Sequence, residues 1–342
     1  GTSITTPGAR GVQADVATLA VDGDGSAALV SGGLELGWNA TTTVSAFDVR
    51  TTATEGGRRL LHGDAATLVG EGAVALAAER RRLDWSGDAK VDGTTLSLPD
   101  IAGTVNAMVA EAWAKGAVAF EDTEGLLRLV WTGTQGAATV EAEFADGAPE
   151  SGGGRVRAAL ERVEGTAELE LARRGDERTL AATTDITARN ADVELPGDRR
   201  VAAQSIALDG TVRGAPGTTE QFSWKGTTTA GGVSLAQGSG DDALSVAAAN
   251  LAFDGRARLV APDAGATPSL VVDGTVRASE ARASAGRAIP IEGAIASVEI
   301  VDLLFDEAKS LLVANRLAVG GFTARGDLDK VGPPSATATA DA

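Results

Sequence analysis

The chain has no cysteine and no tyrosine, and its one histidine is His62. Without cysteine there can be no disulfide bond, no thiolate nucleophile and no cysteine-ligated metal. A lone histidine before a glycine is typical of a surface or edge position, and without a second histidine it does not predict a transition-metal site or a nucleophilic relay. The sequence therefore predicts no metal site and no cofactor.

Basic residues are also in short supply. The chain has 30 Lys and Arg residues against 47 Asp and Glu residues, a formal net charge of −17 and a pI near 4.5. Such a chain repels the phosphates of nucleic acids and the anionic face of a membrane. Nucleic acid is therefore excluded as a partner.

Long apolar runs are absent. No stretch approaches the roughly 20 apolar residues of a membrane-spanning helix, and the chain does not open with the pattern of a signal peptide. We expect residues 1–11 to be a flexible linker after a removed signal or anchor, and residues 331–342 to be a flexible tail. Residues 12–330 then form one continuous array.

No catalytic motif stands out. Carboxylate pairs such as Asp84 with Asp88 occur, but none lies in a distinctive sequence frame. The segment of residues 22–26 resembles the start of a calcium loop, yet its twelfth position is Gly33 where a glutamate is needed, so a turn is the better interpretation. The sequence predicts a protein that is not an enzyme.

What the chain does have is a repeated tryptophan pattern, with an apolar residue two positions before each tryptophan and a small residue two positions after it. The first two intervals are 47 and 46 residues, and the third is about twice that length. A copy without tryptophan follows at residues 270–274, one copy is missing near residue 178, and Trp113 is off the period. This period of about 46 residues indicates an array of one supersecondary unit. The four pairs are Leu36 with Trp38, Leu83 with Trp85, Leu129 with Trp131, and Phe222 with Trp224.

In a β-strand, the apolar residue, the tryptophan and the small residue of each copy point to one face. A glycine beside an indole gives the ring room to lie over the neighbouring backbone. Two interpretations stay open. The tryptophans are either core anchors or the lining of a groove that contacts a ligand.

Alternating polar and apolar residues, interrupted by Gly, Asp and Asn, predict short strands over most of the chain. Asp-Gly pairs, at positions 92–93, 209–210, 254–255 and 273–274, predict hairpin turns and lead to an estimate of about 20 to 26 strands. Residues 100–116 and 155–163 have apolar residues at helical spacing and predict two short helices. The loop of residues 151–154 is interpreted as an insertion within the array. The prediction is an all-β, elongated antiparallel repeat sheet that is curled into a groove, with at most one or two short helices.

The Leu-x-Trp-x-Gly strands, together with the apolar segments of residues 289–306 and 311–321, resemble the AsmA-like family of bacterial envelope proteins, which includes TamB, YhdP and YdbH. The resemblance covers about residues 12–330. It implies a β-taco-like sheet with an open apolar concave face that binds lipid acyl chains and lets them pass between membranes. It also implies a location in the periplasm or cell envelope, with an anchor that is not present in this chain.

Two other classes of protein fit the same pattern. A structural β-repeat scaffold, or a subunit of a larger envelope assembly, would close the apolar face with a second sheet or with envelope protein partners. A carbohydrate-binding module would use the tryptophans as stacking platforms. The difference lies in whether one face of the sheet stays open.

Overall fold

The computed structural model describes residues 2–5, 12–30, 32–51, 59–77, 80–99, 103–123, 125–146, 155–175, 177–215, 218–238, 243–261, 269–285 and 291–326. Within these ranges all regular structure is β-strand, and no helix occurs. The predicted all-β fold is therefore confirmed. The strands are β1 (Thr2–Thr5), β2 (Val12–Val30), β3 (Gly33–Thr51), β4 (Arg59–Ala77), β5 (Arg80–Pro99), β6 (Gly103–Thr123), β7 (Leu126–Asp146), β8 (Arg155–Arg174), β9 (Glu177–Leu195), β10 (Arg199–Gly214), β11 (Glu220–Gln237), β12 (Leu244–Val260), β13 (Ser269–Ala285), β14 (Ile291–Asp306), β15 (Leu311–Val313) and β16 (Arg316–Gly326).

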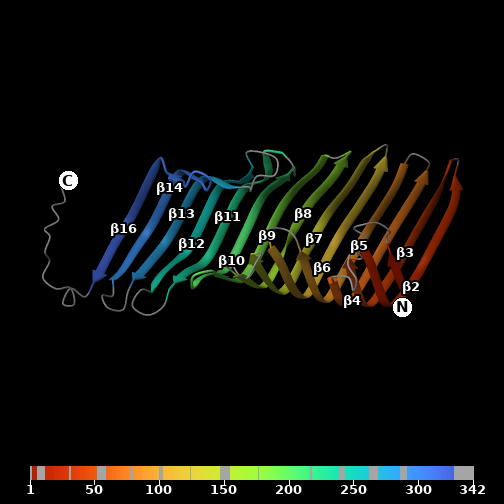
Figure 1. The fold of residues 1–342 in the computed structure, drawn as a ribbon, viewed down its shortest axis with the longest axis horizontal. Coiled ribbons are helices and arrows are strands. Elements are labelled where there is room, and N and C mark those ends of the chain that lie inside the picture. Colours follow the sequence, from red (N-terminus) through yellow and green to blue (C-terminus); the bar gives the residue numbers. More distant parts are fainter. Residues whose placement is uncertain are drawn as a thin grey trace.

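All sixteen strands belong to one antiparallel sheet, and from β1 to β15 strands that are consecutive in the chain are neighbours. β15 and β16 both pair with β14 in the same register, so they form one edge strand that is interrupted at residues 314 and 315. Figure 1 shows the strands side by side from β2 at one end to β16 at the other, in chain order. The elongated antiparallel array is as predicted, but it has fewer and longer strands.

A crease crosses the whole sheet. In every strand except the short β1 and β15, one interior residue has no cross-strand partner, and these residues lie opposite one another from strand to strand. On every second strand the crease residue has a positive φ, between 44° and 63°. The crease residues are Ala17, Ala46, Asp64, Gly93, Ala110, Thr139, Glu161, Asn190, Gln204, Gly232, Ala249, Glu280, Ala296 and Gly321, of which Ala46, Gly93, Thr139, Asn190, Gly232, Glu280 and Gly321 have the positive φ.

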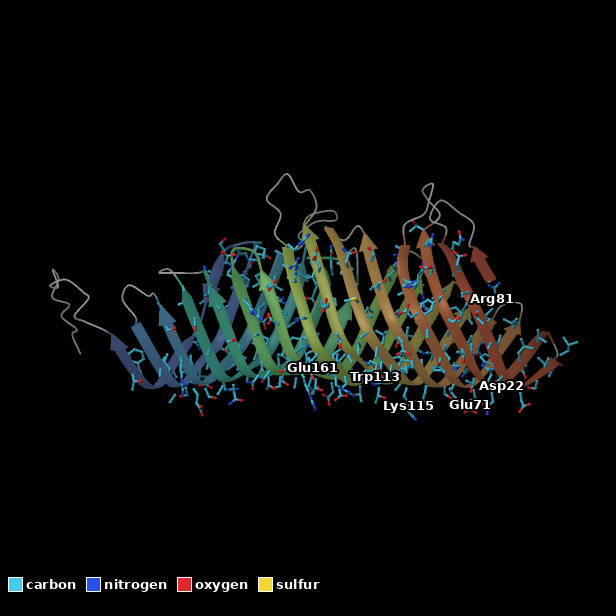
Figure 2. All side chains as sticks on the ribbon, turned by 90° about the horizontal axis from the view of Figure 1, so that it is seen from below. Asp22, Glu71, Arg81, Trp113, Lys115 and Glu161 are labelled. Carbon is cyan, nitrogen blue, oxygen red and sulfur yellow. The ribbon has the colours of Figure 1, made fainter. Side chains whose placement is uncertain are left out.

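The crease explains the curl of the sheet. A residue in the left-handed conformation bends the strand. It also shifts the alternation of side chains between the two faces by one residue. Each strand thus has a short arm and a long arm that meet at the crease, and the same face stays apolar on both arms. Figure 2 shows the result, a trough with a convex underside.

Both predicted helices are wrong, and the crease is the physical reason. Residues 100–116 fall largely in β6, and residues 155–163 fall in β8. In β8, Val156 and Leu160 precede the crease residue Glu161, and Val163 follows it on the same face. The shift in alternation places apolar residues at intervals of four and three, which is the spacing of a helix.

A row of glycines runs parallel to the crease, six residues away along each strand of the long arm. It includes Gly87 opposite Gly116 and Gly226 opposite Gly255. A Cβ at Gly87 would collide with the carbonyl oxygen of Val69 on the neighbouring strand, so this row needs glycine for close approach of the backbones. Ala40, Ala167 and Thr184 occupy the other described positions of the row between β3 and β10.

The predicted hairpin turns at Asp-Gly pairs are therefore also wrong. Gly93 is a crease residue, and Gly210, Gly255 and Gly274 belong to the glycine row in the interior of β10, β12 and β13. The segment of residues 22–26, predicted as a turn, lies within β2. This is why the sheet has 16 strands and not 20 to 26.

The 46-residue period is the length of two strands with their connections. Each repeat tryptophan lies eight residues before a crease residue with positive φ, as for Trp38 with Ala46 and Trp85 with Gly93. The copy that the sequence lacks near residue 178 has its equivalent position at Ala182, eight residues before Asn190.

Thr2–Thr5, expected within a linker, pair with β2 as the short strand β1. The predicted tail of residues 331–342 and the loop of residues 151–154 lie outside the described residues.

The sheet has almost no enclosed core. Among the described residues no large side chain is fully buried, and the buried apolar residues are all alanines. Ala66 and Ala188 lie two residues from the crease on the long arm, and Ala191 and Ala203 lie next to it on the short arm. Four of the five buried alanines among the described residues therefore lie beside the crease, while Ala261, at 1% exposed, directly follows the long-arm end of β12.

Candidate functional site: the concave apolar face

The two faces of the sheet differ in chemistry. Asp22, Glu71 and Lys115 lie on the convex underside (Figure 2). Ion pairs link strands across this face, such as Lys115 to Asp88 at 3.3 Å. Because side chains alternate along a strand, Trp85 and Gly87 lie on the opposite, concave face.

The repeat tryptophans come together in one row on the concave face. Trp85 and Trp131 both lie opposite Val118 of β6, and Trp224 lies between Val212 and Ala257. We call this set the tryptophan row. Its members are Gly25, Trp38, Gly72, Trp85, Val118, Trp131, Leu169, Ala182, Val212, Trp224, Ala257, Val272 and Phe305.

The apolar residues that lead each repeat form a second row, two positions further from the crease. Leu83 lies opposite Phe120, which lies opposite Leu129. We call this set the leucine row. Its members are Ala27, Leu36, Val74, Leu83, Phe120, Leu129, Leu171, Leu180, Gly214, Phe222, Leu259 and Leu270.

All eight residues predicted to line a groove therefore lie on one face, in two straight rows. The sequence analysis missed the members on the intervening strands, such as Val118, Phe120 and Leu171. These strands run in the opposite direction and carry no tryptophan on the concave face, since Trp113 of β6 lies on the convex face. These residues could have been found from the alternating apolar residues that occur about half a period, or one strand, after each tryptophan repeat.

The indole rings lie over the glycine row, as the sequence analysis predicted. A Cβ at Gly133 would be 2.8 Å from Cζ2 of Trp131, and a Cβ at Gly210 would be 2.7 Å from Nε1 of Trp224. Trp224 also stacks on Phe253, with ring centroids 6.0 Å apart. On the concave face, these indole rings therefore pack directly against the backbone of the glycine row.

The two best-defined indoles differ in their hydrogen bonds. Trp131 Nε1 donates to Gln135 Oε1 at 3.2 Å. Trp224 Nε1 is buried and has no hydrogen-bond partner. The residue four positions on from Trp224 is Thr228, which has a shorter side chain than Gln135.

No second layer of described residues covers the concave face. Every substantial contact between elements joins neighbouring strands of the sheet. Leu171, Phe222 and Leu259 of the leucine row are 38 to 39% exposed, which is high for large apolar side chains. Apolar surface of the concave face is therefore left open to solvent.

The next row lies two positions further from the crease than the leucine row, near the mouth of the trough, and contains charged residues. Arg81 of β5 lies opposite Asp122 of β6, with 3.8 Å between their charged atoms. Arg173 and Arg178 face each other in the same row. Figure 2 places Arg81 near the rim, so an apolar floor passes into a polar edge.

Trp113, which is off the period, belongs to the convex face (Figure 2). The guanidinium of Arg162 lies 4.7 Å from the centroid of its ring, and the ring lies against Gly136. This is a cation–π contact between neighbouring hairpins. Trp113 is therefore not part of the concave rows.

The described residues offer no group of three or more His, Asp and Glu side chains that could hold a metal ion. His62 lies between two carboxylates, with Nδ1 3.1 Å from Asp48 and Nε2 3.5 Å from Asp64. A hollow of about 980 Å³ over the short arms is lined by Met108, Glu143 and Arg157 among others. Its charged groups pair with one another, Arg157 with Glu143 at 3.3 Å.

Ion pairs also lower the pKa values of two carboxyl groups, Glu170 and Asp192. The hydrogen bond from Arg128 lowers the pKa of Glu170 below its ordinary value, against an opposing effect of desolvation. The hydrogen bond from Arg200 lowers the pKa of Asp192 in the same way. Both shifts favour the ionised form, so neither group becomes a proton donor at neutral pH.

Comparisons with protein-family models, curated proteins and solved structures give no match to this chain. In the described part of the chain there is no helix long and apolar enough to cross a membrane.

Proposed function

We propose that this protein binds lipid acyl chains along its concave face and transfers them between membranes of a cell envelope, without catalysing a reaction. The observation that supports this proposal most strongly is the uncovered apolar face, which continues in register from strand to strand. An open apolar sheet face needs a covering, and an acyl chain supplies one that can come and go.

The energy of such binding is large enough to matter. Burial of a methylene contributes about 0.8 kcal/mol, so ten buried methylenes contribute on the order of 8 kcal/mol before the costs of association. The half-exposed residues of the leucine row, such as Leu171 and Phe222, have surface left to bury against a chain.

The rows also favour movement along the trough. Neighbouring strands are about 4.8 Å apart, so an acyl chain that shifts by two strands meets the same arrangement of residues again. Repeated sites of similar energy allow motion in small steps. The ionic row near Arg81 and Asp122 would lie beside the polar head groups, which can stay in water.

The proposal includes a location in the periplasm or cell envelope, as the resemblance to AsmA-like proteins implies. Envelope protein partners remain part of the proposal. A structural scaffold is the second candidate function, and one observation favours it. The strands at both ends of the sheet have edges without a described partner, which suits a subunit of a longer assembly.

The test is crosslinking with a photoreactive fatty acid, combined with native mass spectrometry and lipid extraction of protein purified from its host envelope. We expect Leu171→Asp, which places a charge on the concave face, to abolish crosslinking and lipid co-purification. Thr166→Asp is the matched control, because it adds the same charge to the same strand on the convex face. Equal crosslinking of both folded variants, or a wild-type protein without lipid, would favour the scaffold.

A further inference from the structure

The most exposed large apolar side chains gather at the two ends of the sheet. In β2, Leu19, Val21 and Leu29 are 53, 63 and 89% exposed, and in the last strand Leu317 and Phe322 are 63 and 65% exposed. These side chains continue the concave apolar rows, since Leu19 lies opposite Val44 and Leu317 lies opposite Ile300. They are exposed because the described residues include no further strand that would cover them.

The backbone edges at these ends are also open. β1 pairs only with residues 13–16 of β2, so residues 18–30 have no described strand on that side. At the far end, β15 and β16 pair only with β14. The two open edges lie at opposite ends of the molecule (Figure 1). Edge strands with exposed apolar side chains are templates for pairing with another chain.

The two edges fit each other in direction and conformation. β2 runs from the short arm to the long arm, and β16 runs the opposite way, so the two would pair antiparallel. Crease residues with positive φ occur on alternate strands, and the last strand has one at Gly321 whereas β2 has none at Ala17. A β2 strand placed beside β16 therefore continues the alternation without a fault.

The same alignment matches the side chains. With Gly321 opposite Ala17, Val319 faces Leu19 and Leu317 faces Val21 on the concave side. On the convex side, Arg316 faces Asp22. Arg316 now pairs with Glu299 at 2.6 Å, so a second carboxylate would complete a cross-strand network.

We propose that a second copy of this chain docks head to tail, with β16 of one copy paired to the exposed length of β2 of the next. Residues 316–320 pair with residues 18–22 in this interface. Residues 322–325 of β16 take the place of β1 of the next copy, which otherwise pairs with residues 13–16 of β2. The contact is heterologous and does not close on itself, so it builds chains of copies whose concave faces join into one longer trough. This assembly goes beyond acyl-chain binding and does not depend on it.

The absence of cysteine makes the register directly testable by disulfide crosslinking of the full chain, after delipidation. We expect an equal mixture of Leu19→Cys and Val319→Cys proteins to form a covalent dimer on mild oxidation, while neither variant does so alone. Val69→Cys, exposed in the middle of the sheet, replaces Leu19→Cys in the control mixture and should not crosslink. Crosslinking of Leu19→Cys with itself would overturn the proposal in favour of a two-fold contact.

Sedimentation over a range of concentrations tests the same interface without cysteines. We expect mass above the monomer at high concentration, and at least a ten-fold weaker association for Leu19→Lys with Val21→Lys. Asp22→Arg should weaken association similarly, and Arg316→Glu added to the same chain should restore it. A wild-type protein that stays monomeric throughout, or a failure of the charge exchange to restore association in folded protein, would overturn the proposed docking.

Discussion

At the scale of single residues, the glycine row controls how closely the strands approach. A Cβ at Gly133 would collide with the carbonyl oxygen of Lys115 and would lie 2.8 Å from the Trp131 ring. We therefore expect Gly133→Ala to lower the free energy of unfolding by about 1–3 kcal/mol, as overpacking does. The measurement is urea denaturation followed by circular dichroism.

Gly25 provides the matched control for this substitution. It also lies on the concave face, but a Cβ there has its nearest neighbour at 3.5 Å, an ordinary contact. Gly25→Ala should leave stability unchanged or raise it by about 0.4–1 kcal/mol, because alanine restricts the unfolded chain. A loss at Gly25 as large as that at Gly133 would contradict the role of close backbone approach.

The two indoles with different hydrogen bonds make a second comparison. Trp131→Phe removes the bond to Gln135, worth about 0.5–1.5 kcal/mol. Trp224→Phe removes a buried donor that has no partner and keeps an aromatic ring against Phe253. Trp224→Phe should therefore cost less than Trp131→Phe, by roughly 1 kcal/mol, in the same denaturation experiment. An equal loss of unfolding free energy at both positions would show that the loss depends on the buried area removed and not on the hydrogen bond.

The residues predicted from the sequence were those that carry an unusual side chain. Tryptophan is rare enough here for its period to be seen, so Trp38 and Trp85 were placed on one face correctly. Ala182 was missed, because an alanine at the equivalent position has no distinctive signal. Residues that line the groove from strands of the opposite direction, such as Phe120, were missed. Their distance in sequence from the nearest tryptophan depends on the length of the turn between the two strands.

At the scale of elements, the crease stores backbone strain. Thr139 has a φ of 50°, a left-handed conformation that is unfavourable for a β-branched residue. Asparagine tolerates this conformation, and Asn190 occupies the same position two strands on. Thr139→Asn should raise the free energy of unfolding by about 1 kcal/mol, with a corresponding increase in melting temperature.

The converse change tests the same point on a glycine of the crease. Gly93→Val should be strongly destabilising, since its φ is 60° and a Cβ there would collide with the carboxylate of Asp64. If Thr139→Asn proves destabilising in a correctly folded protein, the threonine makes a contact that outweighs its strain.

The sequence predicted strands correctly as the main element, but it predicted too many of them and made them too short, for one reason. Alternation of polar and apolar residues is a reliable signal for strands, but the crease shifts it by one in every strand. Val156, Leu160 and Val163 then mimic a helix, and the glycines of the close-packed row mimic turns. A local pattern does not distinguish a bend within a strand from the end of a strand.

At the scale of the whole molecule, each strand contacts only its neighbours, so stability is a sum of local terms. The sequence predicted the single elongated array, but the open or closed state of its apolar face depends on how the crease folds the sheet. That fold comes from the alignment of fourteen crease residues across strands, which is a property of register and not of any one segment.

The array also predicts which deletions are tolerated. Removal of residues 80–125 takes out β5 and β6 and leaves residues 78 and 79 to join β4 to β7. In the shortened sheet Gly70 faces Gly133, Gly72 faces Trp131 and Asp64 meets Thr139 at the crease, so both rows and the alternation of positive φ are kept. We expect this variant to fold with the same fraction of β-structure by circular dichroism and to unfold at a lower denaturant slope, as its smaller buried surface requires.

Removal of β5 alone, residues 80–102, is the matched control. It joins the long-arm end of β4 to the short-arm start of β6, and these points lie at opposite ends of a strand whose path is about 60 Å for some 19 residues. It also places β4 and β6, two strands of the same direction, in succession. This smaller deletion should unfold the sheet, as measured by loss of the β-signal and by protease sensitivity. Equal stability of the two deletions would show that strand direction and crease alternation do not hold the array together.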